Sequence, residues 1–192
     1  MHRFTLDRFY QTYDTVTRPV TINGQPLELL TPAAIDRFID PADTMHNFPL
    51  WAKIWEASVL LASDLSSLEP NPLRTMLEIG SGLGMVGIAA AKACHCITMS
   101  ERNPDALNFA RANALVNNCP SLTVERLDWQ APHLENRFDY IVGSEIVYQS
   151  ETIDHLEALF DRYLKPGGTI ILAEAVRGTG VDFWERMRHR YE

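Results

Sequence analysis

Several features are scarce in this 192-residue sequence, and each scarcity excludes a class of protein. Cysteine occurs only three times, as Cys94, Cys96 and Cys119. An odd number of thiols cannot all pair within one chain, so a disulfide framework is disfavoured and a reducing compartment, the cytoplasm, is expected. No apolar run is long enough to cross a bilayer, and residues 1–5 lack the apolar stretch of a signal peptide. We therefore expect no membrane association.

Basic residues are also outnumbered. The sequence has 17 lysines and arginines against 25 aspartates and glutamates, which gives a net charge of -8. Binding to a phosphate backbone needs a basic surface, so nucleic acid is not the expected partner. Hydrophobic residues make up 46% and charged residues 22% of the chain, which is ordinary globular composition. The length fits one sizeable domain with a short appendage.

The pattern of the chain changes near residue 48. Residues 1–48 have weak periodicity, and we expect them to form an N-terminal appendage or lid. This segment is predicted to hold a short helix over 4–13, a hairpin that turns at Asn23-Gly24, and a helix over 31–39. Residues 49–192 are expected to form one ligand-binding domain.

Strands and helices alternate through this second part. Apolar runs predict strands over 75–79, 96–99, 122–127, 138–143 and 169–173; helical spacing of apolar residues predicts helices over 55–68, 86–93, 104–117 and 153–164, and a last helix that carries Phe183, Met187 and Tyr191. Such alternation is typical of an α/β fold, a parallel sheet with helices on both faces. Ligands of these sheets bind at the carboxyl ends of the strands, so the residues that follow each strand are the ones to examine.

A glycine-rich turn follows the first strand, where residues 78–84 read Glu-Ile-Gly-Ser-Gly-Leu-Gly. Glycines permit a sharp turn and let a ligand approach the backbone at a helix N-terminus. Gly82, Gly84 and Gly87 also match the dinucleotide pattern G-x-G-x-x-G, and a tight turn without any ligand is a further alternative. The glycines alone therefore do not identify a ligand.

Carboxylates follow the next three strands. Glu101 comes about twenty residues after the glycines, where a carboxylate can accept hydrogen bonds from a ribose. Asp128 and Trp129 suit an adenine, although alone they could equally be a strand cap and a core tryptophan. Glu145 and Tyr148 follow the fourth strand. Three acids at one sheet edge disfavour a triphosphate and favour a cationic or neutral cofactor.

Two other motifs carry less weight. Cys94-His95-Cys96 is spaced too tightly for a metal site and has no second pair of ligands, so we predict no metal. No G-x-S-x-G nucleophile motif is present in the sequence.

Taken together, these motifs resemble those of the class I, seven-β-strand S-adenosylmethionine-dependent methyltransferases. The match rests on residues 77–84 and on Lys165-Pro166-Gly167-Gly168. More narrowly, the chain resembles the lysine methyltransferases that carry an acid-x-x-Tyr motif. That resemblance rests on Trp55, on Asp128-Trp129 and on the run Glu-Ile-Val-Tyr at 145–148, and it covers about residues 49–177.

The resemblance implies a Rossmann-like fold, S-adenosylmethionine as the cofactor and S-adenosylhomocysteine as its product. It implies roles for eleven residues: Glu78 and Gly80 near the methionine part, Gly82 and Gly84 in the same turn, Glu101 at the ribose, Asp128 and Trp129 at the adenine, Trp55 and Ser144 along the cofactor cleft, and Glu145 and Tyr148 facing the substrate nitrogen. The implied activity is N-methylation of a lysine in a protein substrate.

Two departures accompany the resemblance. The family motif usually opens with aspartate, whereas Glu145 is one methylene longer. The sequence also stops inside the expected last helix, so the final two strands of the fold are expected to be missing. Three alternatives stay open: a methyltransferase for a small-molecule amine, a non-catalytic module that binds an adenosine cofactor, and, on the glycines alone, a dinucleotide oxidoreductase.

Overall fold

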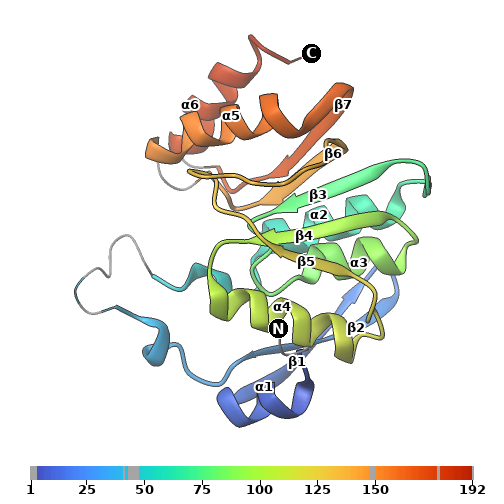
Figure 1. The fold of residues 1–192 in the computed structure, drawn as a ribbon, viewed down its shortest axis with the longest axis vertical. Coiled ribbons are helices and arrows are strands. Elements are labelled where there is room, and N and C mark those ends of the chain that lie inside the picture. Colours follow the sequence, from blue (N-terminus) through green and yellow to red (C-terminus); the bar gives the residue numbers. More distant parts are fainter. Residues whose placement is uncertain (1–3, 41, 43–47, 148–149, 177, 192) are drawn as a thin grey trace.

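A parallel β-sheet forms the centre of the molecule in a computed structural model, which describes residues 4–40, 42, 48–147, 150–176 and 178–191 (Figure 1). Its five strands are β3 (Thr75–Ile79), β4 (Cys96–Glu101), β5 (Thr123–Arg126), β6 (Phe138–Ser144) and β7 (Leu164–Ala173). They lie in the order β5-β4-β3-β6-β7, and every neighbouring pair is parallel. The alternation in the sequence therefore predicted the α/β class correctly.

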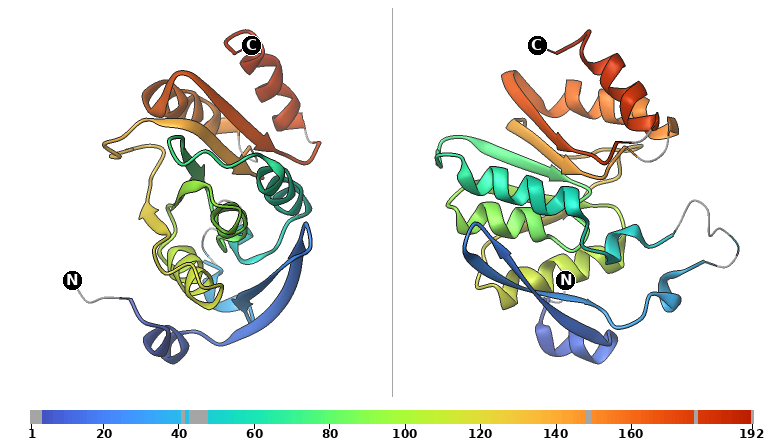
Figure 2. Two further views of the ribbon diagram at one scale, coloured as in Figure 1. Left: turned by 90° about the vertical axis from the view of Figure 1, so that its right-hand side faces the viewer. Right: turned by 180° about the vertical axis from the view of Figure 1, so that it is seen from behind.

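Helices cover both faces of this sheet. The side chains of β3 alternate between the faces: Met76 packs in the apolar cluster that holds α2 and α3, whereas Leu77 and Ile79 pack in the cluster that holds α5 and α6. The right panel of Figure 2 shows α2 and α3 in front of the sheet. The five helices are α2 (Glu56–Ser67), α3 (Met85–Lys92), α4 (Pro104–Val116), α5 (Ile153–Tyr163) and α6 (Gly178–Met187). Burial on both faces explains why the adjacent residues Met76 and Leu77 of β3 are both apolar.

Local signals in the sequence set several of these boundaries. The side chain of Asn103 accepts hydrogen bonds from the amides of Asp105 and Ala106, at 2.8 and 3.1 Å, and Pro104 takes the first helical position of α4. The turn expected at 165–168 lies within the bounds of β7, where pairing with β6 is interrupted between Leu164 and Thr169 and Gly167 adopts a φ of +72°. Within the described residues, no helix is long and apolar enough to cross a membrane.

The N-terminal segment forms α1 (Leu6–Thr12) and a hairpin of β1 (Thr15–Ile22) and β2 (Gln25–Pro32). Asn23 and Gly24 adopt φ values of +48° and +80°, as the predicted two-residue turn requires. The helix predicted over 31–39 is wrong. Thr31 instead extends β2 opposite Val16 and donates its hydroxyl to the Val16 carbonyl at 3.2 Å, and only a short 3-10 turn, Asp36–Phe38, follows.

Two asparagines of α4 hold the hairpin against the domain. The carboxamide of Asn113 accepts from the Leu30 amide at 2.7 Å and donates to the carbonyls of Leu30 and Leu83, at 3.1 and 2.9 Å. Asn117 accepts from the Glu28 amide at 3.0 Å and donates to the Glu28 carbonyl at 2.7 Å. This asparagine clamp satisfies the edge of β2 that faces away from β1. Ile22, Leu27 and Leu29 of the hairpin belong to the same apolar cluster as α2 and α3, whereas Leu30 packs in the cluster that holds Phe9 and Phe109.

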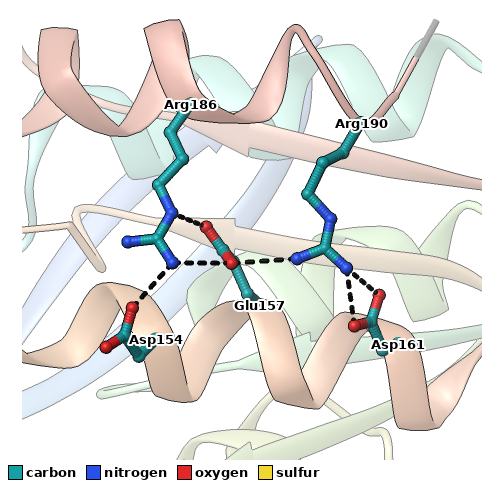
Figure 3. Close-up of polar contacts among 5 residues, drawn as sticks. All are labelled: Asp154, Glu157, Asp161, Arg186 and Arg190. Carbon is teal, nitrogen blue, oxygen red and sulfur yellow. Dashed lines mark hydrogen bonds and ion pairs between the residues drawn. The ribbon is translucent and has the colours of Figure 1, made fainter.

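Charged side chains fix α6 along α5 (Figure 3). Glu157 of α5 is buried, and both Arg186 and Arg190 pair with it. Arg186 also reaches Asp154 at 2.7 Å, and Arg190 contacts both oxygens of Asp161 at 2.8 and 2.7 Å. We call these five residues the α5–α6 charge cluster. It places the start of α6 beside the loop that follows β6.

Candidate active site

A cavity of about 380 Å³ lies at the carboxyl ends of β3, β4 and β6. The chain leaves β3 toward β4 on one side and later returns to β6 on the other, so this is the switch point at which α/β sheets bind ligands. The volume is in the range of small-molecule sites. Nine of the eleven residues singled out in the sequence line it: Trp55, Glu78, Gly80, Gly82, Glu101, Asp128, Trp129, Ser144 and Glu145.

The glycine-rich turn has no space for a side chain at the two glycines that line this cavity. Gly80 and Gly82 have φ values of +67° and +51°, in the left-handed region that favours glycine. A Cβ on Gly80 would lie 3.0 Å from Ile146 Cγ2 and 3.5 Å from the Trp129 ring, and one on Gly82 would lie 3.2 Å from the Trp51 carbonyl oxygen. Gly80 and Gly82 thus line the cavity with backbone atoms alone, and we call them the glycine cradle.

The remaining two predicted residues are placed differently. Gly84 is not among the residues that line the cavity. A Cβ there would lie 3.0 Å from Met99 Sδ and 3.3 Å from Ala110, so this glycine lets α3 pack closely on β4 and α4. Tyr148 lies outside the described residues.

Glu78 is the most unusual group in the site. Its side chain points from β3 under α3 and is only 2% exposed. Burial raises the pKa of its carboxyl to about 8; a hydrogen bond from the Gly87 amide opposes this shift, and the charge of Glu101 adds to it. Among the described residues, Glu78 Oε2 and the nearby Ser81 hydroxyl have no hydrogen-bond partner. These orphaned buried atoms fit a ligand that brings a positive charge and hydrogen-bond donors.

Glu101 is held rigidly at the end of β4. Its Oε1 accepts from the amides of Arg102 and Asn103, at 2.7 and 3.0 Å, and its Oε2 accepts from the Gly82 amide at 3.1 Å. Three of its roughly four acceptor positions are thus occupied, and the carboxylate is fixed in advance with a free position on Oε2 for a hydroxyl donor. Across the cavity, Asp128 follows β5 and accepts from the Gln130 amide at 3.1 Å.

The far end of the cavity is formed by the loop after β6. Ser144 shares a hydrogen bond of 2.8 Å with Ser58 of α2. Glu145 adopts φ +53°, which costs a residue with a Cβ roughly 1–2 kcal/mol. Its amide donates to the Ala173 carbonyl at 2.9 Å, and its Oε1 accepts from the Ala175 amide at 3.0 Å. The neighbouring loop after β7 therefore holds both the backbone and the carboxylate of Glu145.

Sequence reasoning missed Glu174, the residue directly after β7. Its Oε1 accepts from the amides of Ile146 and Val147, at 2.8 and 3.3 Å. The signal was available, since the same rule that selected the residues after the first four strands, applied to the fifth, selects Glu174.

Other cavity residues were missed for a different reason. Trp51 and Lys53 line the cavity, with Lys53 Nζ 4.3 Å from the centre of the Trp55 ring. Phe38 and His155 line it as well. These residues follow no strand of the sheet, so no pattern in the sequence marks them. Within the described part of the chain, no three histidine, cysteine, aspartate or glutamate side chains gather in a way that could hold a metal ion.

Comparison with known proteins places the chain in a family. A family model described as lysine methyltransferase matches residues 43–189. The protein N-lysine methyltransferase METTL21A of Xenopus tropicalis is 31% identical over 146 residues, which cover 71% of this chain and 66% of that protein. The protein-lysine N-methyltransferase rrg1 of Schizosaccharomyces pombe is 28% identical over 155 residues, which cover 72% of this chain and 51% of that protein. The chain thus spans between half and two thirds of the length of these relatives.

Solved structures agree on the fold. The glycopeptide N-methyltransferase MtfA, in its complex with S-adenosyl-L-homocysteine, superposes with a TM-score of 0.51 at 21% identity. The superposition covers 60% of this chain and 47% of that chain. At this identity the likeness shows a shared Rossmann-like architecture.

Proposed function

Because this chain belongs to the lysine methyltransferase family, we propose that it is an S-adenosylmethionine-dependent enzyme that N-methylates a lysine side chain of a protein. The observation that carries the proposal is the cavity at the strand ends, where the buried Glu78 carboxyl with its unpaired Oε2, a bare glycine cradle and a pre-positioned Glu101 carboxylate meet. This combination fits a cofactor that has an ammonium group at one end and a ribose in the middle.

In this proposal different cavity residues bind different parts of the cofactor. Glu78 and the cradle of Gly80 and Gly82 would hold the methionine part, and Glu101 would accept from the ribose hydroxyls. Asp128 and Trp129 would contact the adenine, and Trp55 and Ser144 would line the rest of the cofactor cleft. Gly84 supports the turn from behind through its packing on β4 and α4.

The bound cofactor supplies a methyl group already activated by a sulfonium, so no covalent nucleophile of the protein is required. The chain's own residues then have three tasks: to align the acceptor nitrogen, to exclude water and to let the nitrogen lose its proton. The loop after β6 lies at the end of the cavity where an acceptor would enter, which gives Glu145 the first of these tasks. Tyr148 is proposed to face the same nitrogen on the strength of the acid-x-x-Tyr motif.

The charge of Glu145 limits what it can do. A carboxylate beside a lysine ammonium stabilises the charged form and raises the pKa of the lysine, which opposes deprotonation. Holding and orienting the acceptor is therefore the role proposed for Glu145. We expect Glu145→Gln, which keeps an oxygen for the Ala175 amide, to lower methyl transfer while cofactor binding survives.

The cytoplasm is the proposed location. Cys94, Cys96 and Cys119 all carry free thiols, and two of them are exposed. Unpaired exposed thiols suit a reducing compartment.

Methyl transfer from radiolabelled S-adenosylmethionine into the proteins of a cell extract tests the proposal. We expect label in discrete protein bands that yields methyl-lysine on acid hydrolysis. Glu101→Ala should abolish labelling, whereas Glu125→Ala, a matched carboxylate exposed on the neighbouring β5, should not. Label recovered as methyl-arginine, or only in small molecules, would overturn the lysine assignment. Cofactor binding without any transfer would identify a non-catalytic module.

A further inference from the structure

The loops that follow β6 and β7 are tied to each other by reciprocal hydrogen bonds. Glu145 Oε1 accepts from the Ala175 amide at 3.0 Å, and Glu174 Oε1 accepts from the amides of Ile146 and Val147, at 2.8 and 3.3 Å. Each loop therefore supplies one carboxylate that binds the backbone of the other. We call this arrangement the carboxylate exchange.

Two further contacts hold the same three residues of the β6 loop. The Ala173 carbonyl accepts from the Glu145 amide at 2.9 Å, and the hydroxyl of Thr179, in the first turn of α6, donates to the Val147 carbonyl at 3.0 Å. The backbone of residues 145–147 is thus held by residues 173–179. Because the α5–α6 charge cluster fixes α6 on α5, the Thr179 contact comes from an anchored helix (Figure 3).

The left-handed backbone of Glu145 explains why so many contacts are needed. A residue with a Cβ keeps a φ of +53° only where its surroundings determine that conformation, and such strain concentrates at functional sites. Glu174 is the only described side chain whose carboxylate bonds the two amides that follow the strained residue. A charged acceptor that receives two N–H groups makes stronger hydrogen bonds than a neutral one.

We propose that Glu174 is a positioning residue for methyl transfer, which holds residues 145–147 so that Glu145 presents itself to the acceptor nitrogen. The inference rests on the proposed function. Glu174 is not among the residues that line the cavity, so it acts on the acceptor only through the β6 loop. The cofactor end of the site, at Glu78 and Glu101, lies on other strands and does not depend on it.

Three substitutions of Glu174 separate the effect of its side-chain length from the effect of its charge. Glu174→Gln keeps a carbonyl oxygen at the same distance along the side chain. Glu174→Asp keeps the charge but is one methylene too short, and Glu174→Ala removes the acceptor altogether. We expect the Gln variant to lie between the wild type and the Ala variant, because its neutral oxygen accepts weaker hydrogen bonds, and the Asp variant to resemble the Ala variant. Asp182→Ala, at an exposed position of α6, serves as the unchanged control.

Amide hydrogen exchange measures how firmly Glu174 holds the β6 loop, and kinetics measure the effect on methyl transfer. In the Ala and Asp variants we expect faster exchange at the amides of Ile146 and Val147 and a kcat at least tenfold lower, with the cofactor dissociation constant within twofold of wild type. Unchanged exchange at both amides would overturn the inference by itself. A Gln variant as impaired as the Ala variant, or a loss of cofactor affinity in step with kcat, would also overturn it. Absence of transfer by the wild type would instead refute the proposed function, and the exchange rates would still test the carboxylate exchange.

Discussion

The buried carboxyl of Glu78 makes a prediction about stability that does not depend on enzymatic activity. Its pKa is about 8 in the folded protein and 4.5 as the reference value, so the folded state keeps a proton that the unfolded chain releases. Because the folded pKa is raised, the free energy of unfolding falls as the pH rises from 4.5 to 8. Glu78 should destabilise the protein progressively across this range.

The magnitude follows from the interval between the two pKa values. Each pH unit corresponds to about 1.4 kcal/mol, so the penalty reaches about 3 kcal/mol at pH 7 and about 4 kcal/mol at pH 8, where half of the folded molecules have also lost the proton. Glu78→Gln has nearly the same shape and does not titrate. The variant should therefore gain stability over the wild type by these amounts as the pH is raised, whereas below pH 4.5 the difference between the two proteins should be constant.

Urea unfolding of both proteins without cofactor, at intervals from pH 4 to pH 8.5, measures this difference. All other titratable groups are common to the two proteins, so their pH dependence cancels in the comparison. Parallel stability profiles across the whole range would refute the reasoning. A second measurement concerns the ligand: an ammonium against Glu78 lowers its pKa, so cofactor binding at pH 7 should release a proton. The binding enthalpy of the wild type should then vary with the ionisation enthalpy of the buffer, and that of the Gln variant should not.

Three further substitutions test the scaffold around the site. Gly87→Ala would place a Cβ 2.6 Å from Glu78 Oε2, and we expect a loss of about 1–3 kcal/mol in thermal unfolding, whereas Gly178→Ala, which faces open space, should change little. Asn113→Leu should leave three buried backbone groups without hydrogen-bond partners and cost roughly 3 kcal/mol or more in urea unfolding. It should also weaken cofactor binding, because one of these groups, the Leu83 carbonyl, belongs to the glycine-rich turn. An unchanged unfolding midpoint would contradict the asparagine clamp. Glu157→Gln should be cleaved within α6 faster than the wild type. The ratio of the two cleavage rates should fall as salt is added, because salt weakens the ion pairs of the wild type. Equal cleavage rates at low salt would contradict the α5–α6 charge cluster.

The sequence was most informative where one local rule decides the structure. Strand–helix alternation predicted the five parallel strands and the helices between them, and Asn23-Gly24 predicted the hairpin turn, because positive φ values select those residues. The position of residues directly after strands selected several residues that line the cavity, among them Gly80, Asp128 and Glu145. The family resemblance predicted the lysine methyltransferase family, and the family model confirmed it.

The sequence was least informative where distant segments decide the outcome. Thr31-Pro32 looked like a helix start, but pairing with β1 and the contacts of β2 with α4 favoured a strand. Gly84 looked like part of a ligand turn, but its environment is set by Met99 and Ala110, which arrive from β4 and α4. The buried state of Glu78 was equally invisible, since nothing within residues 75–84 shows that α3 covers its side chain.

The asparagine clamp also determines which substitutions this region can accept. The hydrogen bonds that Asn117 makes to Glu28 involve only the backbone of Glu28, whose side chain is exposed, so position 28 should accept any residue except proline, which lacks the amide hydrogen. Position 117 has no such freedom, because its side chain must donate and accept at once. Slow deamidation of Asn117 to aspartate would set an oxygen against the carbonyls of Glu28 and Asn113 and remove two of the three hydrogen bonds of this side chain. Chemical ageing of a single helix residue would thus loosen a hairpin about ninety positions earlier in the chain.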